Sequence, residues 1–190
     1  MTDRHAHSRR RFLRQGLGWA AAGAAPKLAL AAVPAAGTGG GAMRELAFNH
    51  THTRERINLV YAVDSAYVPD ALGRLNLFMR DHYSGTVGHM DPLLFDQLHQ
   101  VRTLLGARIP FEVISGYRCP ETNENLRQTR AGGVAKRSMH MEGRAIDVRL
   151  PGVPLAELRD AALSLQAGGV GYYPAEQFVH IDTGRVRRWG

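Results

Sequence analysis

Two short apolar runs that carry ionisable side chains at alternate positions most constrain how this chain can fold. They are residues 145–150 (AIDVRL) and 178–182 (FVHID). Side chains alternate between the two faces of a strand, so Asp147 lies opposite its apolar neighbours, and His180 shares one face with Asp182. An ionised carboxylate buried without a partner is strongly destabilising, so Asp147 requires a cation, hydrogen-bond donors or exposure to water.

A metal ion is one cation that would satisfy Asp147. The glycine-containing stretch at residues 138–147 (SMHMEGRAID) places His140 before this aspartate, with six residues between them. Zn²⁺ bound by His140, Asp147 and His180 would leave a fourth tetrahedral position for water, as in catalytic zinc sites. The metal would lower the pKa of that water to about 7 and polarise a carbonyl group. From spacing alone, a hydrogen-bonded pair in a loop is the commoner explanation of His140 and Asp147, and both interpretations stay open.

The remaining pattern predicts one α+β domain over residues 37–190, with a mostly antiparallel sheet flanked by helices. Asp91 and Pro92 are typical of a helix N-cap and first turn, and apolar residues recur with helical spacing after them. The predicted strands are 45–48, 56–63, 145–150, 168–173 and 178–182, together with a strand that leaves into a loop within 111–118. The predicted helices are 69–82, 91–106, 120–128 and 155–165. The first two strands, and the last two, are expected to pair as hairpins.

Residues 1–36 are predicted to be a twin-arginine-type signal peptide and linker. The stretch 8–14 (SRRRFLR) resembles the twin-arginine export signature, which predicts a periplasmic protein. A weakly apolar run follows, and Pro26 and Lys27 interrupt it before the ~20 residues needed to span a bilayer. We therefore expect no stable membrane span once the signal is cleaved. A general secretory signal or an uncleaved anchor is the alternative.

The net charge of +7 reflects the N-terminal segment more than the domain. Residues 1–31 carry six basic residues and one acidic residue, so they contribute +5 and leave +2 for the rest of the chain. That small excess gives no reason to expect a nucleic-acid partner. The single cysteine, Cys119, excludes an intramolecular disulfide, so stability must come from packing or from a bound metal.

Three motifs occur in order along the chain: SGYR at 115–118, SxHxxGxAxD at 138–147 and FVHID at 178–182. Together they resemble zinc metallopeptidases that cut D-amino-acid peptides of the bacterial cell wall. This group includes D-alanyl-D-alanine carboxypeptidases, and its fold is shared with the lysostaphin and hedgehog domains. Within the group, the chain is most similar to the exported MepK-type murein endopeptidases, long described as a domain of unknown function. The resemblance runs from about Arg44 to Trp189.

The resemblance implies a function and a set of site residues. The function is zinc-dependent hydrolysis of the peptide cross-links of peptidoglycan, with peptide stems as the partner and a zinc-activated water as the nucleophile. The implied zinc ligands are His140, Asp147 and His180. Arg118, with Ser115 and Tyr117 in the same motif, becomes the substrate-binding group, since a guanidinium holds a carboxylate or carbonyl through directed hydrogen bonds.

One departure from the family pattern concerns the general base. Many of these peptidases have a glutamate three residues before the last histidine, where this chain has Gln177. An amide cannot accept a proton from water. The remaining candidates are Glu176 and Asp182, and Asp182 is preferred because alternation places it on the face of His180, ~6.6 Å along the strand. Asp182 could equally orient His180 or form an ion pair with Arg185 or Arg187.

Three alternative functions stay open. A D,D-carboxypeptidase would use the same ligands on a different bond. A zinc-containing cell-wall-binding module of the same fold would lack catalysis, which the missing glutamate would explain. A cysteine enzyme would pair Cys119 with His140, although a proline directly after the nucleophile fits that reading poorly.

Overall fold

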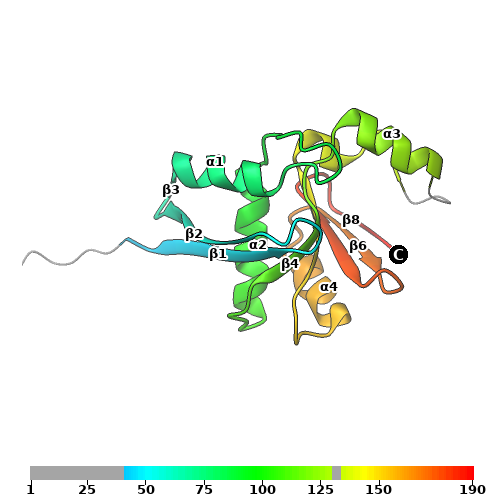
Figure 1. Cartoon of the computed structure of the whole chain (residues 1–190). Helices are drawn as coiled ribbons and strands as arrows, with labels where there is room; N and C mark the ends of the chain where they lie inside the picture. The colour runs from blue at the N-terminus through cyan, green and yellow to red at the C-terminus, as the bar shows by residue number, and fades with distance from the viewer. Residues whose placement is uncertain (1–40, 130–133) are drawn as a thin grey trace, which may run out of the picture. The chain divides into compact units, whose positions relative to one another are not determined.

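The structure is a computed structural model that describes residues 41–129 and 134–190, and it contains an eight-stranded mixed sheet with helices packed on it (Figure 1). The predicted α+β fold is therefore confirmed. The strands are β1 (Met43–His50), β2 (Arg56–Val63), β3 (Ala66–Tyr67), β4 (Phe111–Ser115), β5 (Ala145–Arg149), β6 (Gly169–Tyr173), β7 (Phe178–Asp182) and β8 (Arg187–Trp189). The helices are α1 (Pro69–Phe78), α2 (Pro92–Leu104), α3 (Pro120–Thr129), α4 (Leu155–Ser164) and the 3₁₀ helix η1 (Met139–Glu142). The predicted signal at 1–36 lies outside the described residues.

The strand order of the sheet is β3-β2-β1-β4-β5-β7-β6-β8. Neighbouring strands run antiparallel except for two parallel pairs, β1 with β4 and β6 with β8. Both predicted hairpins, β1–β2 and β6–β7, are present. The prediction of a mostly antiparallel sheet is confirmed.

One face of the sheet is apolar and carries the hydrophobic core. The strand register aligns buried apolar residues across it: Leu46 with Leu59, Phe48 with Phe111, Val113 with Val148, and Ile146 with Ile181. Three helices contribute buried side chains to the same core, with α1 against β2, α2 against β1, and α4 against β6 and β7 (Figure 1). Removing this apolar surface from water is the main contribution to the stability of the fold.

The opposite face of the sheet carries the predicted ligands. Asp147 of β5 pairs with His180 of β7, and strand alternation turns both away from the core. The β4–β5 register shifts between Val113 and Ser115, which marks a β-bulge. A bulge inserts one extra residue and re-aims the side chains that follow, so Ser115 pairs with Asp147 although Val113 belongs to the core.

One helix is shorter than the sequence pattern predicts. Helix α1 ends at Phe78 rather than at residue 82, and Asp81 Oδ1 accepts a hydrogen bond from Tyr83 N at 2.9 Å in the turn that follows. Strand β4 ends at Ser115 and a loop begins at Gly116, in agreement with the prediction that the strand leaves into a loop within 111–118. The short elements β3, β8 and η1 were not predicted, since two to four residues carry too little periodic signal.

The start of α2 agrees with the prediction. Asp91 is its N-cap, and the carboxylate accepts a hydrogen bond from Leu93 N at 3.0 Å, while Pro92 begins the helix. Across residues 41–129 and 134–190, no helix combines the length and apolar character that crossing a bilayer would require.

Candidate metal centre

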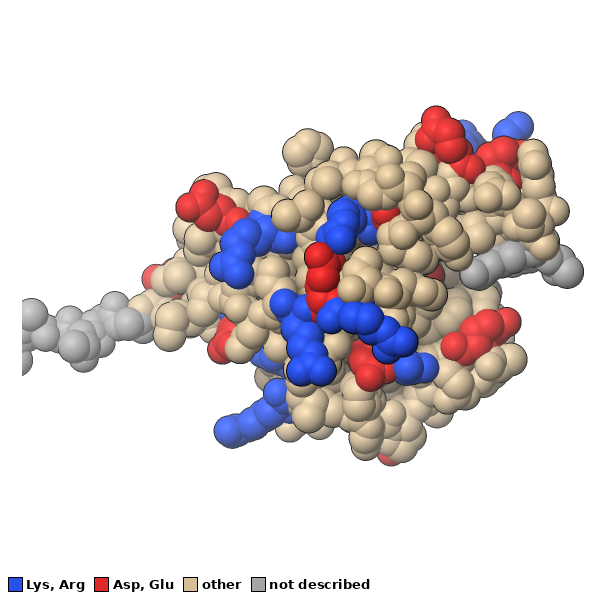
Figure 2. All heavy atoms as spheres, in the orientation of Figure 1, with Lys and Arg blue, Asp and Glu red and all other residues tan. Residues whose placement is uncertain are grey.

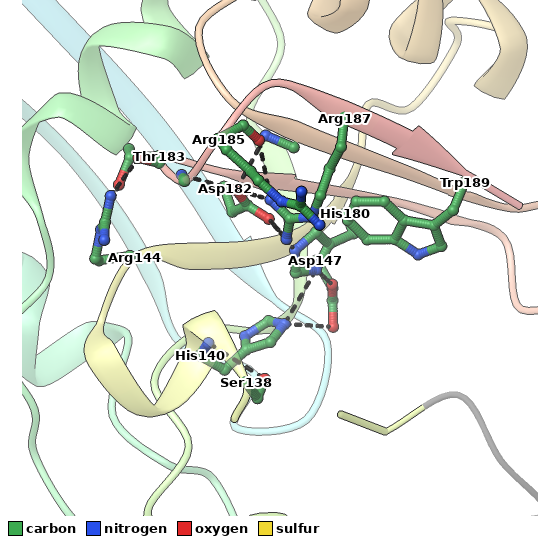
Figure 3. A network of polar contacts seen from close by, with 12 residues as sticks. Ser138, His140, Arg144, Asp147, His180, Asp182, Thr183, Arg185, Arg187 and Trp189 are labelled. Atoms are coloured by element: carbon green, nitrogen blue, oxygen red, sulfur yellow. Dashed lines mark hydrogen bonds and ion pairs between the residues drawn. The ribbon is translucent and has the colours of Figure 1, made fainter. Parts of the chain in front are cut away.

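Three side chains from separate parts of the chain converge on the polar face of the sheet (Figure 3). His140 comes from η1, Asp147 from β5 and His180 from β7. Each offers one ligand atom, and these atoms lie within 4.8 Å of one another. The residues are only 3%, 6% and 8% exposed, respectively. The three predicted ligands are thus brought together, away from bulk water.

Hydrogen bonds outside the cluster decide which nitrogen of each histidine faces its centre. His140 Nδ1 donates to the backbone oxygen of Gly116 at 2.7 Å, since a carbonyl oxygen can only accept. His180 Nε2 donates to Asp182 Oδ2 at 3.1 Å. In a neutral imidazole the other nitrogen then carries a lone pair. When both imidazoles are neutral, His140 Nε2, His180 Nδ1 and the Asp147 carboxylate therefore face one another as three acceptors.

The spacing of these acceptors fits a small cation. His140 Nε2 lies 3.3 Å from His180 Nδ1 and 3.3 Å from Asp147 Oδ2, and His180 Nδ1 lies 2.8 Å from Asp147 Oδ1. In a tetrahedral site with zinc–ligand bonds of ~2.0–2.1 Å, neighbouring ligand atoms are ~3.3 Å apart. Two histidines and one carboxylate match the ligand types that zinc takes in catalytic sites. The donor set and its spacing fit Zn²⁺.

Burial and charge shift the pKa of each ligand in a different direction. Burial alone would raise the pKa of Asp147, but the adjacent histidines lower it well below its usual value. Burial lowers the pKa of His140, and the nearby carboxylate only partly offsets this. Burial would also lower the pKa of His180, but its hydrogen bonds to Asp147 and Asp182 raise it by more. In the absence of metal, a proton on His180 stabilises the cluster, so metal binding releases that proton.

Asp182, one of the two predicted general bases, is the fully buried hydrogen-bond partner of His180. Its carboxylate also accepts hydrogen bonds from Arg187 Nη2 at 2.6 Å and from the backbone nitrogens of Gly169 and Gly184 at 3.0 and 2.8 Å. Burial raises the pKa of Asp182, but His180, Arg187 and the backbone donors lower it well below the usual value. A carboxylate with so many donors is a weak proton acceptor and a strong constraint on the His180 ring.

The other predicted base, Glu176, lies exposed in the turn between β6 and β7. The next residue, Gln177, adopts a left-handed φ of 60°, and its side chain donates to the backbone oxygen of Pro174. Within the described residues, the hydrogen bonds of the three ligands do not involve Glu176. The assignment of either carboxylate as the base stays a prediction.

Arg118, the predicted substrate anchor, lies beside the cluster. Its Nη2 is 3.8 Å from Asp147 Oδ2 and donates to Ser115 Oγ at 3.3 Å, and its Nη1 donates to Asn123 Oδ1 at 3.4 Å. Its backbone nitrogen donates to His140 O at 3.2 Å, which ties the SGYR loop to η1. Arg118 and Ser115 therefore lie next to the ligands, as the motif predicted.

Two other residues of this segment lie against the neighbouring loop. The ring of Tyr117 packs so closely on Gly88 that a Cβ there would come within 2.2 Å of it. Cys119 is 4% exposed, and its Sγ contacts Thr122 at 3.3 Å and Ser84 at 3.5 Å. Within the described part of the chain, these hydroxyls and the Asp81 carboxylate, rather than a histidine, are the polar neighbours of the thiol. The pairing of Cys119 with His140 that a cysteine enzyme would require is therefore not formed.

The position of His140 depends on how η1 begins and ends. Ser138 caps its start, and Ser138 Oγ accepts a hydrogen bond from His140 N at 3.4 Å. Gly143 ends it with a left-handed φ of 66°, and a Cβ there would lie 1.8 Å from the backbone oxygen of His89. Both the backbone conformation and the lack of space therefore require glycine at this position.

Two contacts of the centre were missed by sequence reasoning. Gly116 contributes its backbone carbonyl, and a backbone contact cannot be predicted from the type of residue. The position of Gly116 within the SGYR motif was the one signal that pointed to this loop. Trp189 of β8 lies with its ring centroid 5.2 Å from that of His180, above Gly171, where a Cβ would meet the indole. No pattern in the sequence predicted β8, so nothing pointed to Trp189.

Comparisons with known proteins indicate the same family as the three sequence motifs. A protein-family profile described as "Peptidoglycan L,D-endopeptidase MepK" matches residues 39–189. The peptidoglycan L,D-endopeptidase MepK of Escherichia coli (strain K12) is 47% identical over 146 residues, which are 77% of this chain and 80% of the relative. The probable peptidoglycan L,D-endopeptidase MepK of Haemophilus influenzae is 44% identical over 147 residues, 77% of this chain and 78% of the relative.

No solved structure gives a significant match. The profile extends over most of the chain, and the relatives are similar over most of their own length. The three motifs, with the ligands that they supply, lie inside the matched region. The chain therefore belongs to the MepK family of peptidoglycan L,D-endopeptidases.

Proposed function

We propose that this protein is a zinc-dependent peptidase that hydrolyses peptide cross-links of peptidoglycan. The observation that carries the proposal is the convergence of His140 Nε2, His180 Nδ1 and the Asp147 carboxylate as three buried ligand atoms within 4.8 Å of one another. A divalent cation would take the place of the proton that His180 holds in the absence of metal. Family membership supports the substrate class, because the relatives are named peptidoglycan L,D-endopeptidases.

Each residue of the centre has a distinct task in this proposal. His140, Asp147 and His180 would hold Zn²⁺, which when bound would supply a Lewis acid that activates water and polarises a carbonyl. The Gly116 carbonyl and the Asp182 carboxylate each hold one ring N–H of a ligand histidine. They thereby fix the tautomer and prevent the ring from rotating away from the ion.

Arg118 would bind the substrate next to the reacting bond. Its guanidinium is held by Ser115 and Asn123, so little conformational freedom is lost when it binds a carbonyl or carboxylate. A side chain that is 11% exposed and beside the ligands retains its charge and can orient a peptide across them.

Two carboxylates are the candidates for the general base that accepts a proton from the attacking water. Asp182 adjoins the ligands, but donors occupy its oxygens, whereas Glu176 is exposed and has no hydrogen-bond partner among the described residues. Glu176→Gln and Asp182→Asn variants separate the roles. The variant that loses the base should show a lower kcat at full zinc content, and a variant that loses a positioning group should show weaker zinc binding.

The direct test incubates the full chain with cross-linked muropeptide dimers, with and without a chelator, and follows the products by mass spectrometry. The expected result is conversion of dimers to monomers that stops with chelator and returns with added Zn²⁺. His180→Ala should contain no zinc and give no product. Release of a single terminal residue would instead indicate a carboxypeptidase, and binding without cleavage would indicate a cell-wall-binding module.

We also propose export to the periplasm by the twin-arginine route. The basis is the stretch SRRRFLR at residues 8–14. A fusion of residues 1–36 to a reporter that folds before export tests this. The reporter should reach the periplasm, and substitution of Arg9 and Arg10 by lysine should retain it inside the cell. Export of the substituted fusion would contradict the proposal.

A further inference from the structure

A polar hollow of about 370 Å³ lies on the sheet close to the metal centre. It is formed by the turn between β1 and β2 and by the neighbouring ends of β4 and β5. Its lining includes Asn49, Arg54, Arg56, Glu112 and Arg149. Figure 2 shows basic and acidic side chains gathered over the middle of this side of the molecule. No sequence motif discussed above involves this region.

The hollow shares its sheet face with the metal ligands. Arg149 lies two residues beyond Asp147 on β5, so both side chains point to the same side, ~7 Å apart along the strand. The strand register continues the row across the sheet, from Arg149 to Glu112, then to Asn49 and to Arg56. Because neighbouring strands are ~4.8 Å apart, this row covers a region ~7–16 Å from Asp147.

The charges of the hollow are not balanced within it. Arg149 Nε pairs with Glu112 at 2.6 Å, and Glu55 pairs with Arg80 at 2.8 Å. Among the residues that the structure describes, Arg54 and Arg56 form no hydrogen bond or ion pair through their side chains, and both are exposed. Two guanidinium groups are thus left to bind an anion from outside the chain.

The turn that carries Arg54 is held by its own hydrogen bonds. His50 Nδ1 accepts from the backbone nitrogens of His52 and Thr53 at 3.2 and 3.4 Å, and His50 O accepts from Arg54 N at 3.0 Å. Arg54 itself has a left-handed φ of 62°, which is uncommon for a non-glycine residue. The hydrogen bonds of His50 hold the turn in the conformation that presents this guanidinium.

We propose that this hollow binds a free carboxylate of the peptide stem, two to five residues from the bond that is cut. The range follows from the ~7–16 Å separation and the ~3.3 Å per residue of an extended peptide. The inference rests on the proposed function, since it assumes a peptide laid across the metal centre. The hollow would be a second anion-binding subsite, separate from Arg118 and formed by other elements of the fold.

The test compares two synthetic stem peptides, one with free side carboxylates and one with the same carboxylates amidated. Binding to the metal-free full chain is measured by calorimetry, so that the result does not depend on hydrolysis. The wild-type protein should bind the free-carboxylate peptide about tenfold more tightly, as expected for one or two partly solvated charge-assisted hydrogen bonds. The double variant Arg54→Ala, Arg56→Ala should lose most of this preference, and what is left would come from Arg118.

The matched control is Arg74→Ala, which removes an exposed arginine from α1, away from the hollow. It should retain the tenfold preference, and so separates the hollow from a general effect of net charge. A wild-type protein that binds both peptides equally, or binds neither, overturns the inference. So does a double variant that keeps the full tenfold preference. If the preference holds while zinc-loaded protein cleaves no muropeptide, the proposed function fails and the subsite stands.

Discussion

The two faces of the sheet are built by the same strands and have opposite chemistry. On one face, Phe48, Val113 and Ile146 are fully buried among other apolar side chains. On the other face, Asp147 and His180 form a hydrogen bond within a buried group of ionisable side chains. The packing of the apolar face holds the strands in register, and this register positions the side chains of the polar face. Burying ionisable groups reduces stability, and the core must offset that reduction.

The largest expected effect is on the polar face. Asp147→Asn keeps the shape of the side chain but removes the charge that faces two histidine nitrogens. Zinc content should fall to background, and muropeptide cleavage should drop on the order of 10³-fold, as expected from the loss of several kcal/mol of metal-dependent stabilisation. Elemental analysis and a cleavage assay measure both, and far-UV circular dichroism should show an unchanged fold. Full activity with bound zinc would rule out the proposed centre.

The matching substitution on the apolar face is Phe48→Ala. The Phe48 ring is fully buried between those of Phe78, Phe95 and Phe111, with centroids 6.1–6.5 Å away. Its removal leaves a cavity and should lower the free energy of unfolding by about 3–5 kcal/mol. Calorimetry should show a Tm lower by about 10 °C. The cleavage rate per folded molecule should stay near that of the wild type, and a comparable loss of zinc would show that the two faces are not separable.

A smaller effect is expected for His50, a polar residue at the end of the apolar face. Burial and the nearby His52 lower the pKa of His50 from 6.5 to about 4. Between these values the unfolded chain binds a proton that the folded protein does not. The stability contribution is therefore complete above pH 6.5 and falls, by about 2–3 kcal/mol, as the pH drops towards 4. Urea denaturation over this pH range measures the loss.

The control for this measurement is His50→Asn. Its side-chain oxygen can still accept from the backbone nitrogens of His52 and Thr53, but it does not titrate. The stability of the variant should fall less steeply below pH 6.5 than that of the wild type. Equal slopes would mean that His50 is protonated as easily in the folded protein as in the unfolded chain.

The smallest expected effect is that of Asp182→Asn, which tests how far the polar face depends on groups that do not touch the metal. The amide can still accept the His180 N–H but loses its charge, so zinc affinity should fall about 10–100-fold. Competition with a chromogenic chelator measures this. The matched control is Asp160→Asn on the exposed side of α4, which should leave zinc affinity unchanged. An unchanged affinity in Asp182→Asn would leave this carboxylate with a purely structural role.

Predictions from the sequence were most accurate for elements in which the periodicity of apolar residues shows which side chains face the core. Alternation placed Asp147 and His180 on the face away from the core, and the β5–β7 register agrees. Helix α2 was predicted from its apolar spacing and from Asp91, because the cap and the buried stripe are both local features.

The partners of the centre were less predictable, because they depend on contacts between distant segments. Asp182 was favoured as a base from its strand position, but its charge is bound by Arg187 and by Gly169 N. That arrangement requires β8 to lie parallel to β6, and no local pattern encodes the pairing. The end of α1 and the use of the Gly116 carbonyl likewise depend on neighbours that the chain reaches only after folding.

The bulge in β4 makes the count of residues, and not just their identity, a condition for this centre. One residue inserted between Asp147 and Val148 would lie opposite the extra residue of β4 and restore a regular ladder. Asp147 would then share a face with Val148 and turn into the hydrophobic core, together with its partner Ser115. The strands around the centre can therefore accept point changes, whereas the gain of a single codon at that place would remove a predicted metal ligand in one step.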